Sequence, residues 1–211
     1  MKLYVAKTPK LLKWVFKSKI WEVKTDKKEV FITFDDGPTL EVTDFVLDQL
    51  ETHKAKASFF CIGKNMREHP EILNRIKADG HSIGNHTYNH YNCYKYSLEE
   101  YLKNIGLTAE LIKEYEPSSK KLFRPPYGRI SSKATKALQG QGYKIIMWDV
   151  LSADFDLRNT ADQCVRNVID NIKPGSIIVF HDSIKSYPVL KEVLPKVLNE
   201  LKKTGYRCSA L

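Results

Sequence analysis

From residue 29 onwards, short apolar runs alternate with longer segments whose apolar positions recur every three or four residues. The short runs predict strands, and the longer segments predict amphipathic helices. We expect strands at 30–34, 57–62, 81–84, 122–124, 143–148, 176–181 and 206–209. We expect helices near 41–53, 65–79, 97–115, 131–140, 160–172 and 187–203. This regular alternation is typical of an α/β fold with a parallel sheet and outer helices, built as a barrel or an open sheet.

The first 28 residues differ from the rest in charge. They contain nine lysines against Glu22 and Asp26, so they carry seven of the nine surplus positive charges of the chain. The nearly neutral remainder lacks the basic face of a nucleic-acid-binding fold, and we expect no nucleic-acid partner. We therefore expect a basic N-terminal extension, residues 1–28, packed on one catalytic domain, residues 29–211. We expect that domain to be a monomer.

Apolar residues at helical spacings also occur in this extension. We expect them to pack onto the domain while the lysines face water; they are Leu11, Leu12, Trp14, Val15 and Phe16. A basic amphipathic helix on a membrane surface is the less favoured alternative. Lysines interrupt every apolar stretch here, so we expect no transmembrane segment and find no convincing signal peptide. The location is therefore unknown, and cytoplasmic by default.

Polar residues follow five of the expected strands, at or just beyond the point where each strand ends. These residues are Asp35 and Asp36, His86, Arg124, Asp154 and His181. Parallel strands in a barrel present their C-terminal ends at one face, where active sites are built. We therefore expect these side chains to converge on one site.

The donor types in this set suit a hydrolytic metal centre. Two neutral imidazoles, His86 and His90, with one carboxylate are a zinc-like ligand set that leaves a position for water. The second carboxylate of the Asp35-Asp36 pair would be free for proton transfer. Taken alone, such a pair often caps a turn, and two histidines four residues apart are often an ordinary polar pair. Cys93 is a weaker candidate for a fourth ligand.

Two further strings supply the remaining chemistry. In RPPYG (residues 124–128) the prolines lack N–H groups, so the Tyr127 amide is the first available donor and a candidate for an oxyanion site. Arg124 could hold a carboxylate by two hydrogen bonds. His181 suits protonation of a leaving group, and Asp154 could orient it. Each string alone would also fit an ordinary turn or loop.

Four strings occur in a characteristic order: TFDDGP (33–38), HTYNH (86–90), RPPYG (124–128) and VFHD (179–182). Together they resemble the motifs of the polysaccharide deacetylases, the NodB-homology family or carbohydrate esterase family 4. The resemblance covers about residues 29–209. It implies a distorted (β/α) barrel of about seven parallel strands with outer helices.

The resemblance also implies roles for the polar residues. A divalent metal, usually zinc although cobalt or another ion is an alternative, would be held by Asp36, His86 and His90. The implied general base is Asp35, oriented by Arg124, and the implied general acid is His181, oriented by Asp154; the oxyanion donor would be the Tyr127 amide.

The implied reaction is metal-dependent removal of N-acetyl groups from a glycan that contains N-acetylglucosamine, such as a chitin oligosaccharide or peptidoglycan. Three alternatives stay open: O-deacetylation of acetylxylan, hydrolysis of a small non-glycan amide, and a catalytically silent glycan-binding relative.

Two departures from the family pattern bear on the substrate. Residues 151–155 read LSADF where the family carries Asp-x-x-Asp-Trp, so Asp154 is retained while Leu151 and Phe155 differ. A leucine common in the acetyl-methyl pocket is replaced by Val179. We expect Tyr127, Phe155 and Val179 to contact the substrate.

Overall fold

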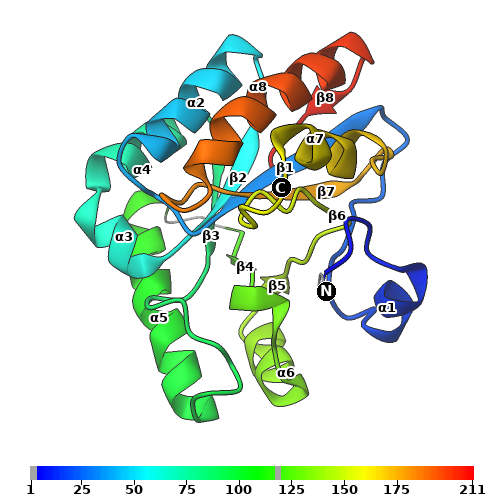
Figure 1. The fold of residues 1–211 in the computed structure, drawn as a ribbon. Coiled ribbons are helices and arrows are strands. Elements are labelled where there is room, and N and C mark those ends of the chain that lie inside the picture. Colours follow the sequence, from blue (N-terminus) through cyan, green and yellow to red (C-terminus); the bar gives the residue numbers. More distant parts are fainter. Residues whose placement is uncertain (1–3, 117–119) are drawn as a thin grey trace.

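Eight parallel strands form the sheet, which the computed structural model shows curled into a half-barrel (Figure 1). The model describes residues 4–116 and 120–211. The strand order is β5-β4-β3-β2-β1-β7-β6, and β8 pairs with the start of β1. The strands are β1 Glu29–Asp35, β2 Ala57–Cys61, β3 Ser82–Asn85, β4 Leu122–Phe123, β5 Lys144–Ile145, β6 Val150–Leu151, β7 Ile177–His181 and β8 Arg207–Cys208. The predicted α/β fold with parallel strands and outer helices is confirmed.

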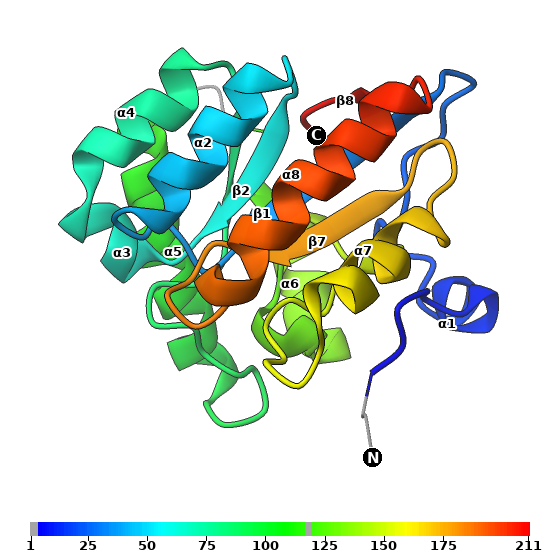
Figure 2. The same cartoon turned by 45° about the horizontal axis from the view of Figure 1, so that its top comes forward.

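Helices cover the outside of this sheet: α2 Val42–Thr52, α3 Gly63–Glu68, α4 Pro70–Ala78, α5 Leu98–Tyr115, α6 Ser132–Gly140, α7 Ala161–Ile169 and α8 Tyr187–Lys203, with a 3₁₀ turn at Pro126–Gly128. A further helix, α1 Lys10–Val15, belongs to the N-terminal segment and buries none of its residues. Figure 2 shows α2, α8 and α7 side by side over β1 and β7. The longest helix, α5, begins with a capping box in which the side chains of Ser97 and Glu100 each bind the other residue's N–H.

The central strands β1, β2 and β7 are almost entirely buried. A strand buried on both faces needs a continuous apolar run, as in residues 30–34, and not an alternating one. Phe34 lies at the centre, with its ring stacked 5.2 Å from that of Phe59 and 5.9 Å from that of Phe180. This packing fixes β1 between its neighbours, and with it the two carboxylates at its end.

Two expected elements differ from the structure. The helix expected at 65–79 is two helices, because Pro70 cannot continue a helix from the residues before it and instead starts α4. The strand expected at 143–148 is shorter: β5 covers only Lys144–Ile145, and Ile146 forms an isolated bridge. A further two-residue strand, β6, was not expected, because its apolar pair follows Asp149 and is too short to give a pattern.

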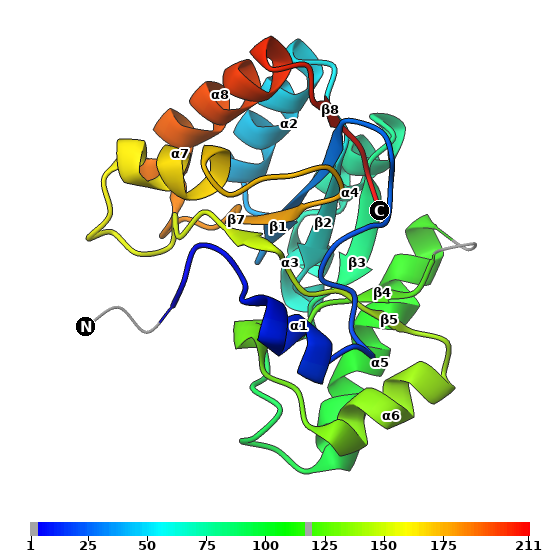
Figure 3. The ribbon, with the colours of Figure 1, turned by 90° about the vertical axis from the view of Figure 1, so that its right-hand side faces the viewer.

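The N-terminal residues contact both edges of the half-barrel. Lys7 forms an antiparallel bridge with Val150 of β6, and Ile20 forms a parallel bridge with Ile146, just after β5. Figure 3 shows this dark-blue segment on the β6 side of the sheet. Lys7 also donates a 2.6 Å hydrogen bond to the fully buried carboxylate of Asp149.

The side chains of α1 lie differently from the prediction. Leu11 and Trp14 are 71% and 74% exposed, and Val15 and Phe16 are also exposed. Lys13 instead points inward, where its amino group pairs with Asp149. The expectation that the apolar side chains of this segment pack onto the domain is therefore wrong. Within the described residues no helix is long and apolar enough to cross a membrane.

Candidate active site

Two adjacent aspartates stand at the end of the central strand. Asp35 is the last residue of β1 and lies in register with His181, the last residue of β7. Asp36 follows with a left-handed backbone, φ 84°, which turns its side chain away from that of Asp35. The two carboxylates therefore have different surroundings, although they are neighbours in the sequence.

Asp36 meets two histidines. Its Oδ1 atom lies 3.7 Å from His86 Nε2 and 3.3 Å from His90 Nε2. One ligand atom from each residue lies within 4.8 Å of the others. Asp36 Oδ1 is also buried and has no hydrogen-bond partner among the described residues. A buried carboxylate oxygen facing two imidazole nitrogens fits a divalent cation, which would satisfy that oxygen.

The two histidines are brought together by a loop. Residues 86–90 are not helical, and Thr87 and His90 have φ of 65° and 54°. Asn104 of α5 fixes this loop by accepting hydrogen bonds from the N–H groups of Tyr88 and Asn89 at 2.8 and 3.1 Å. His86 Nδ1 lies 2.7 Å from the Arg124 carbonyl, which leaves Nε2 free to face Asp36.

His90 is held in its neutral form. Burial, followed by the neighbouring charge of His86, lowers the pKa of His90 from its ordinary value to about 4. A neutral imidazole is the form that binds a metal. Its ring also packs 4.6 Å from that of Tyr127, which closes this side of the cluster.

Arg124 is completely buried beneath the site. Its Nη1 donates 2.6 Å hydrogen bonds to Asp35 Oδ1 and to Thr33 Oγ1. Its other donors bind the carbonyls of Ile146 and Met147 at 3.3 and 3.1 Å. Arg124 therefore holds the Asp35 carboxylate through one of its oxygens, and the expected two-bond grip on the carboxylate does not occur.

His181 is paired with a buried carboxylate. Its Nδ1 and its backbone N–H both lie 2.8 Å from oxygens of Asp154, to which Ser152 also donates. Burial alone would lower the pKa of His181, but the charge and hydrogen bond of Asp154 outweigh it and raise that pKa to about 9. His181 therefore carries a proton at neutral pH.

The Tyr127 amide lies where a rigid turn leaves it unpaired. The two amides that follow it, those of Gly128 and Arg129, donate to the carbonyls of Pro125 and Pro126. Tyr127 itself has φ 60°, and within 4–116 and 120–211 its N–H donates to no partner. This amide is available to a bound oxygen.

These groups surround one cavity of about 350 Å³. Its lining contains the predicted residues Asp35, Asp36, His86, His90, Tyr127, Phe155, Val179 and His181, together with Tyr4, Gly128, Trp148, Leu151, Ser183 and Lys185. Arg124 and Asp154 lie behind the lining and contact it through Asp35 and His181. Cys93 lies outside the cluster and accepts a hydrogen bond from Ser131.

The roles of four residues at the site were not identified from the sequence. Asp182 is buried and accepts hydrogen bonds from Gly37 N–H and Thr43 Oγ1, which fixes the turn after Asp36. A Cβ at Gly37 would come within 1.9 Å of Asp182, so only glycine fits there. Asn104 is a polar residue on the apolar face of its helix, which is a signal that could have been used. No feature of the sequence indicated that Tyr4, in the N-terminal extension, would line the cleft.

Backbone strain is concentrated at this site. Among the described non-glycine residues with positive φ are Asp36, Thr87, His90, Tyr127 and Ala153, all in or next to the cleft. Each such residue costs on the order of 1 kcal/mol or more. Strain kept at several adjoining positions is typical of a functional site that the surrounding fold holds in place.

A half-barrel with an Asp-His-His cluster and a carboxylate-histidine pair at the C-terminal ends of its parallel strands has the architecture of a metal-dependent hydrolase site. Residues 22–146 match the polysaccharide deacetylase family model. The chain therefore belongs to the polysaccharide deacetylase family and is classed with the hydrolases acting on non-peptide carbon–nitrogen bonds. The predicted family is confirmed.

Individual relatives agree with this. A peptidoglycan-N-acetylglucosamine deacetylase of Bacillus cereus is 39% identical over 86% of this chain and 66% of its own length. A second one from that organism is 37% identical over 89% of this chain and 88% of its own length. The crystal structure of the Bc1960 peptidoglycan N-acetylglucosamine deacetylase, 37% identical, superposes with a TM-score of 0.88 over 97% of this chain and 95% of that chain.

Proposed function

We propose that this protein removes N-acetyl groups from a glycan that contains N-acetylglucosamine, with a peptidoglycan-like polymer as the first candidate. The observation that carries the proposal is the joint presence in one cleft of the Asp36-His86-His90 cluster, the Asp35 carboxylate and the His181 ring paired with Asp154. The relatives described above are named for this substrate, which supports the choice of glycan.

The proposed metal ligands are Asp36, His86 and His90, and zinc is the ion that this donor set favours. Bound there, the ion would act as a Lewis acid that lowers the pKa of water and polarises the acetyl carbonyl. The unpartnered Asp36 Oδ1 and the neutral His90 support this assignment.

The two proton transfers are assigned to Asp35 and His181. Asp35, held by Arg124, would accept a proton from the attacking water as general base. His181, charged through its contact with Asp154, would give its proton to the nitrogen of the breaking amide bond. The water oxygen joins the acetyl carbon, the carbon–nitrogen bond breaks, and the products are acetate and a free amino sugar.

The remaining proposed contacts orient the acetyl group. The Tyr127 N–H would donate to the carbonyl oxygen as negative charge develops on it. Phe155 and Val179, which line the cleft beside His181, would contact the substrate on its apolar side. Phe155 keeps an aromatic wall where the family has tryptophan, without an indole N–H.

Acetate release tests the proposal directly. Metal-stripped and zinc-reconstituted protein is incubated with peptidoglycan, chitin oligomers and acetylxylan. We expect release from an N-acetylated glycan only after reconstitution. Zinc-loaded protein that is silent on all three polymers but cleaves a small amide would overturn the glycan assignment. Release from acetylxylan alone would replace N-deacetylation by O-deacetylation.

The base assignment has its own test. Asp35→Asn should lower kcat at least about 100-fold, because the amide cannot accept the proton. Asp26→Asn, an exposed aspartate of the extension, is the matched control and should leave kcat unchanged. Near-wild-type turnover by the Asp35 variant would contradict the assignment.

A further inference from the structure

The cleft has a wall that comes from outside the half-barrel. Residues 6–8 run antiparallel beside β6, where Leu151 N–H donates to the Ala6 carbonyl at 2.8 Å and Thr8 N–H to the Asp149 carbonyl at 2.9 Å. Thr8 Oγ1 also donates to the Trp148 carbonyl. This edge pairing places Tyr4 at the cleft.

The Tyr4 side chain is fixed there at its hydroxyl. The hydroxyl donates to Asp156 Oδ2 at 2.6 Å and accepts from Asn159 Nδ2 at 2.8 Å. With its polar end bound on both sides, Tyr4 has only its ring to offer to the cavity that it lines. That ring packs edge-on against Phe155, 5.4 Å away.

Tyr4 also belongs to the apolar part of the cleft. It packs with Phe155 and Trp148 against the buried residues Leu151 and Val179. Phe155 in turn lies 5.0 Å from the His181 ring, beside the proposed proton donor. The apolar cluster is therefore next to the position of the reacting amide, where the acyl methyl group must be received.

We infer that Tyr4 closes the acyl-binding wall, so that the N-terminal segment limits the length of acyl chain that the cleft accepts. The inference rests on the proposed deacetylase function. Replacing the ring by a methyl group opens space beside Phe155 for at least one further methylene, and one methylene in an apolar pocket changes kcat/KM by about tenfold or more.

The test uses the N-acetyl and N-propionyl forms of the same glucosamine oligomer. Tyr4→Ala should raise the propionyl-to-acetyl ratio of kcat/KM about tenfold. Tyr4→Phe keeps the ring, and Tyr94→Ala removes an exposed tyrosine outside the lining; both should leave the ratio unchanged. A ratio that does not move in Tyr4→Ala, even if both rates fall together, overturns the inference.

Calorimetric affinities for the same two oligomers separate this inference from the proposed function. If wild-type protein binds them without turnover, the deacetylase proposal fails, while the affinity ratio of Tyr4→Ala against wild type still decides the role of Tyr4. The proposed role of Tyr4 is refuted if Tyr4→Ala leaves the propionyl-to-acetyl affinity ratio unchanged and the corresponding ratio of kcat/KM is unchanged or cannot be measured.

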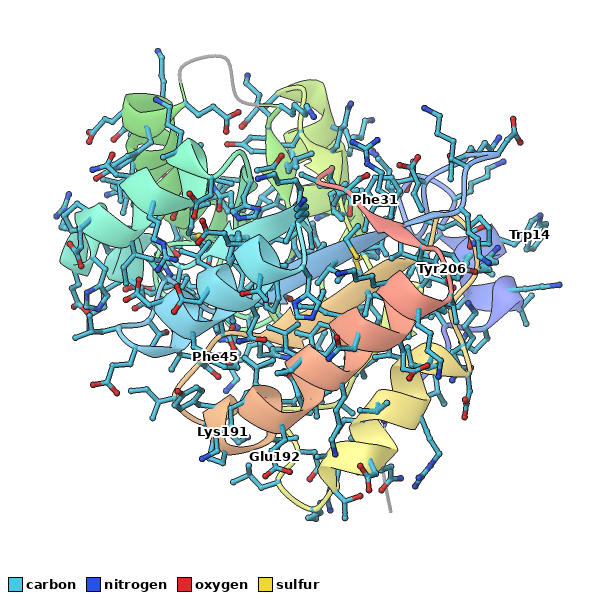
Figure 4. All side chains as sticks on the ribbon, turned by 90° about the horizontal axis from the view of Figure 1, so that it is seen from above. Trp14, Phe31, Phe45, Lys191, Glu192 and Tyr206 are labelled. Atoms are coloured by element: carbon cyan, nitrogen blue, oxygen red, sulfur yellow. The ribbon has the colours of Figure 1, made fainter. Side chains whose placement is uncertain are left out.

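A second feature, the helix α1, is inverted relative to an ordinary surface helix. Amphipathic helices turn their apolar face to the core and their charges to water. Here Leu11, Trp14 and Val15 share the outer face, while Lys13 points inward to Asp149 and Glu22. Figure 4 shows Trp14 projecting from the edge of the molecule.

Lysines flank this outer face. Residues 1–21 contain six lysines and no acidic residue, and of these Lys7 and Lys13 turn inward to Asp149. Lys10 and Lys17 are exposed at the two ends of the helix, and the Lys19 amino group lies 4.4 Å from the centre of the Phe16 ring. Exposed tryptophan and leucine with flanking lysines are the combination that binds the interface of an anionic bilayer.

We propose that α1 docks the protein on an anionic phospholipid surface. Full-length protein is sedimented with vesicles of phosphatidylglycerol and phosphatidylcholine, and with vesicles of phosphatidylcholine alone. We expect binding about tenfold or more tighter to the anionic vesicles, weakening with salt. The double variant Leu11→Ser/Trp14→Ser should lose it, and the matched double Leu40→Ser/Leu107→Ser, also at exposed leucines, should keep it.

Three outcomes contradict this proposal: no vesicle binding by wild type, equal binding by the α1 double variant, or a concentration-dependent dimer in sedimentation velocity that this variant abolishes. The last would assign the outer face of α1 to a second copy of the chain.

Discussion

Replacing Arg124 by methionine tests the ion pair on which the site is built. Methionine keeps much of the side-chain length but removes the charge and every donor. The side chains of Arg124 and Asp35 are 0% and 6% exposed, so the change leaves a buried carboxylate without its counter-charge. It also removes the donors that bind Thr33 Oγ1 and two backbone carbonyls.

The cost can be worked from that geometry. Removing one partner of a buried pair costs about 3–5 kcal/mol. For a chain of 211 residues, an unfolding entropy near 2.1 cal/mol/K per residue converts this to a fall in Tm of roughly 7–11 °C. Activity should fall at least about 100-fold, because Asp35 loses the group that holds it as a charged base.

Urea unfolding, monitored by circular dichroism, measures the free energy of unfolding, and acetate release measures the activity. The double variant Asp35→Asn/Arg124→Met distinguishes an unpaired charge from poor packing. It should recover part of the lost stability, because no unpaired charge remains, and none of the activity. A single variant within about 1 kcal/mol of wild type, or a double variant less stable than the single one, would refute the reasoning.

Three further predictions concern the acid, the metal ligands and a helix cap. Because Asp154 holds the pKa of His181 above its ordinary value, at about 9, their pairing stabilises the fold at low and neutral pH and is lost as pH rises through that value. In an NMR titration of metal-free protein, Asp154→Asn should lower the pKa of His181 below about 6.5. The fall of kcat/KM at alkaline pH should then begin at lower pH than in wild type, and an unchanged pH profile would contradict the prediction. Zinc at 100 times its Kd should stabilise the wild-type protein by about 2.7 kcal/mol and so raise its Tm. His90→Ala should abolish this rise in Tm, and an undiminished rise would exclude His90 as a ligand. Ser97→Ala should lower the free energy of unfolding by about 1 kcal/mol through loss of the α5 cap, and no change in the urea midpoint would contradict this.

The sequence predicted the centre of the fold well because burial dominates there. The strands β1, β2 and β7 are continuous apolar runs, and no other local structure competes with them. Parallel pairing then fixes where their ends lie, so residues that follow different strands could be assigned to one site without a structure. Asp35 and His181, 146 positions apart, come into register for this reason.

The conformation of the connecting loops could not be predicted in the same way. His86 and His90 lie four residues apart in a non-helical loop, and they meet because Thr87 and His90 take left-handed conformations. Such conformations are unfavourable for these residues in isolation. They persist because hydrogen bonds to Asn85 and to Asn104, which lies in α5, hold the loop. Local propensity therefore argues against the geometry that the site requires.

The extension shows the same limit for the orientation of a helix. The spacing of apolar and charged residues divides α1 into two faces but does not say which face turns inward, because that depends on the side chains of the domain against which the helix packs. Here the domain presents Asp149, a carboxylate 136 positions from Lys13, whose burial would be costly without a partner. Lys13 and Lys7 both turn inward to it, and hydrogen bonds from Lys13, Lys7 and Ser176 outweigh the effect of burial and keep the pKa of Asp149 below its ordinary value. Because Lys13 occupies the inner face, the apolar residues are left outside, and because Lys7 is held beside β6, Tyr4 is brought to the cleft.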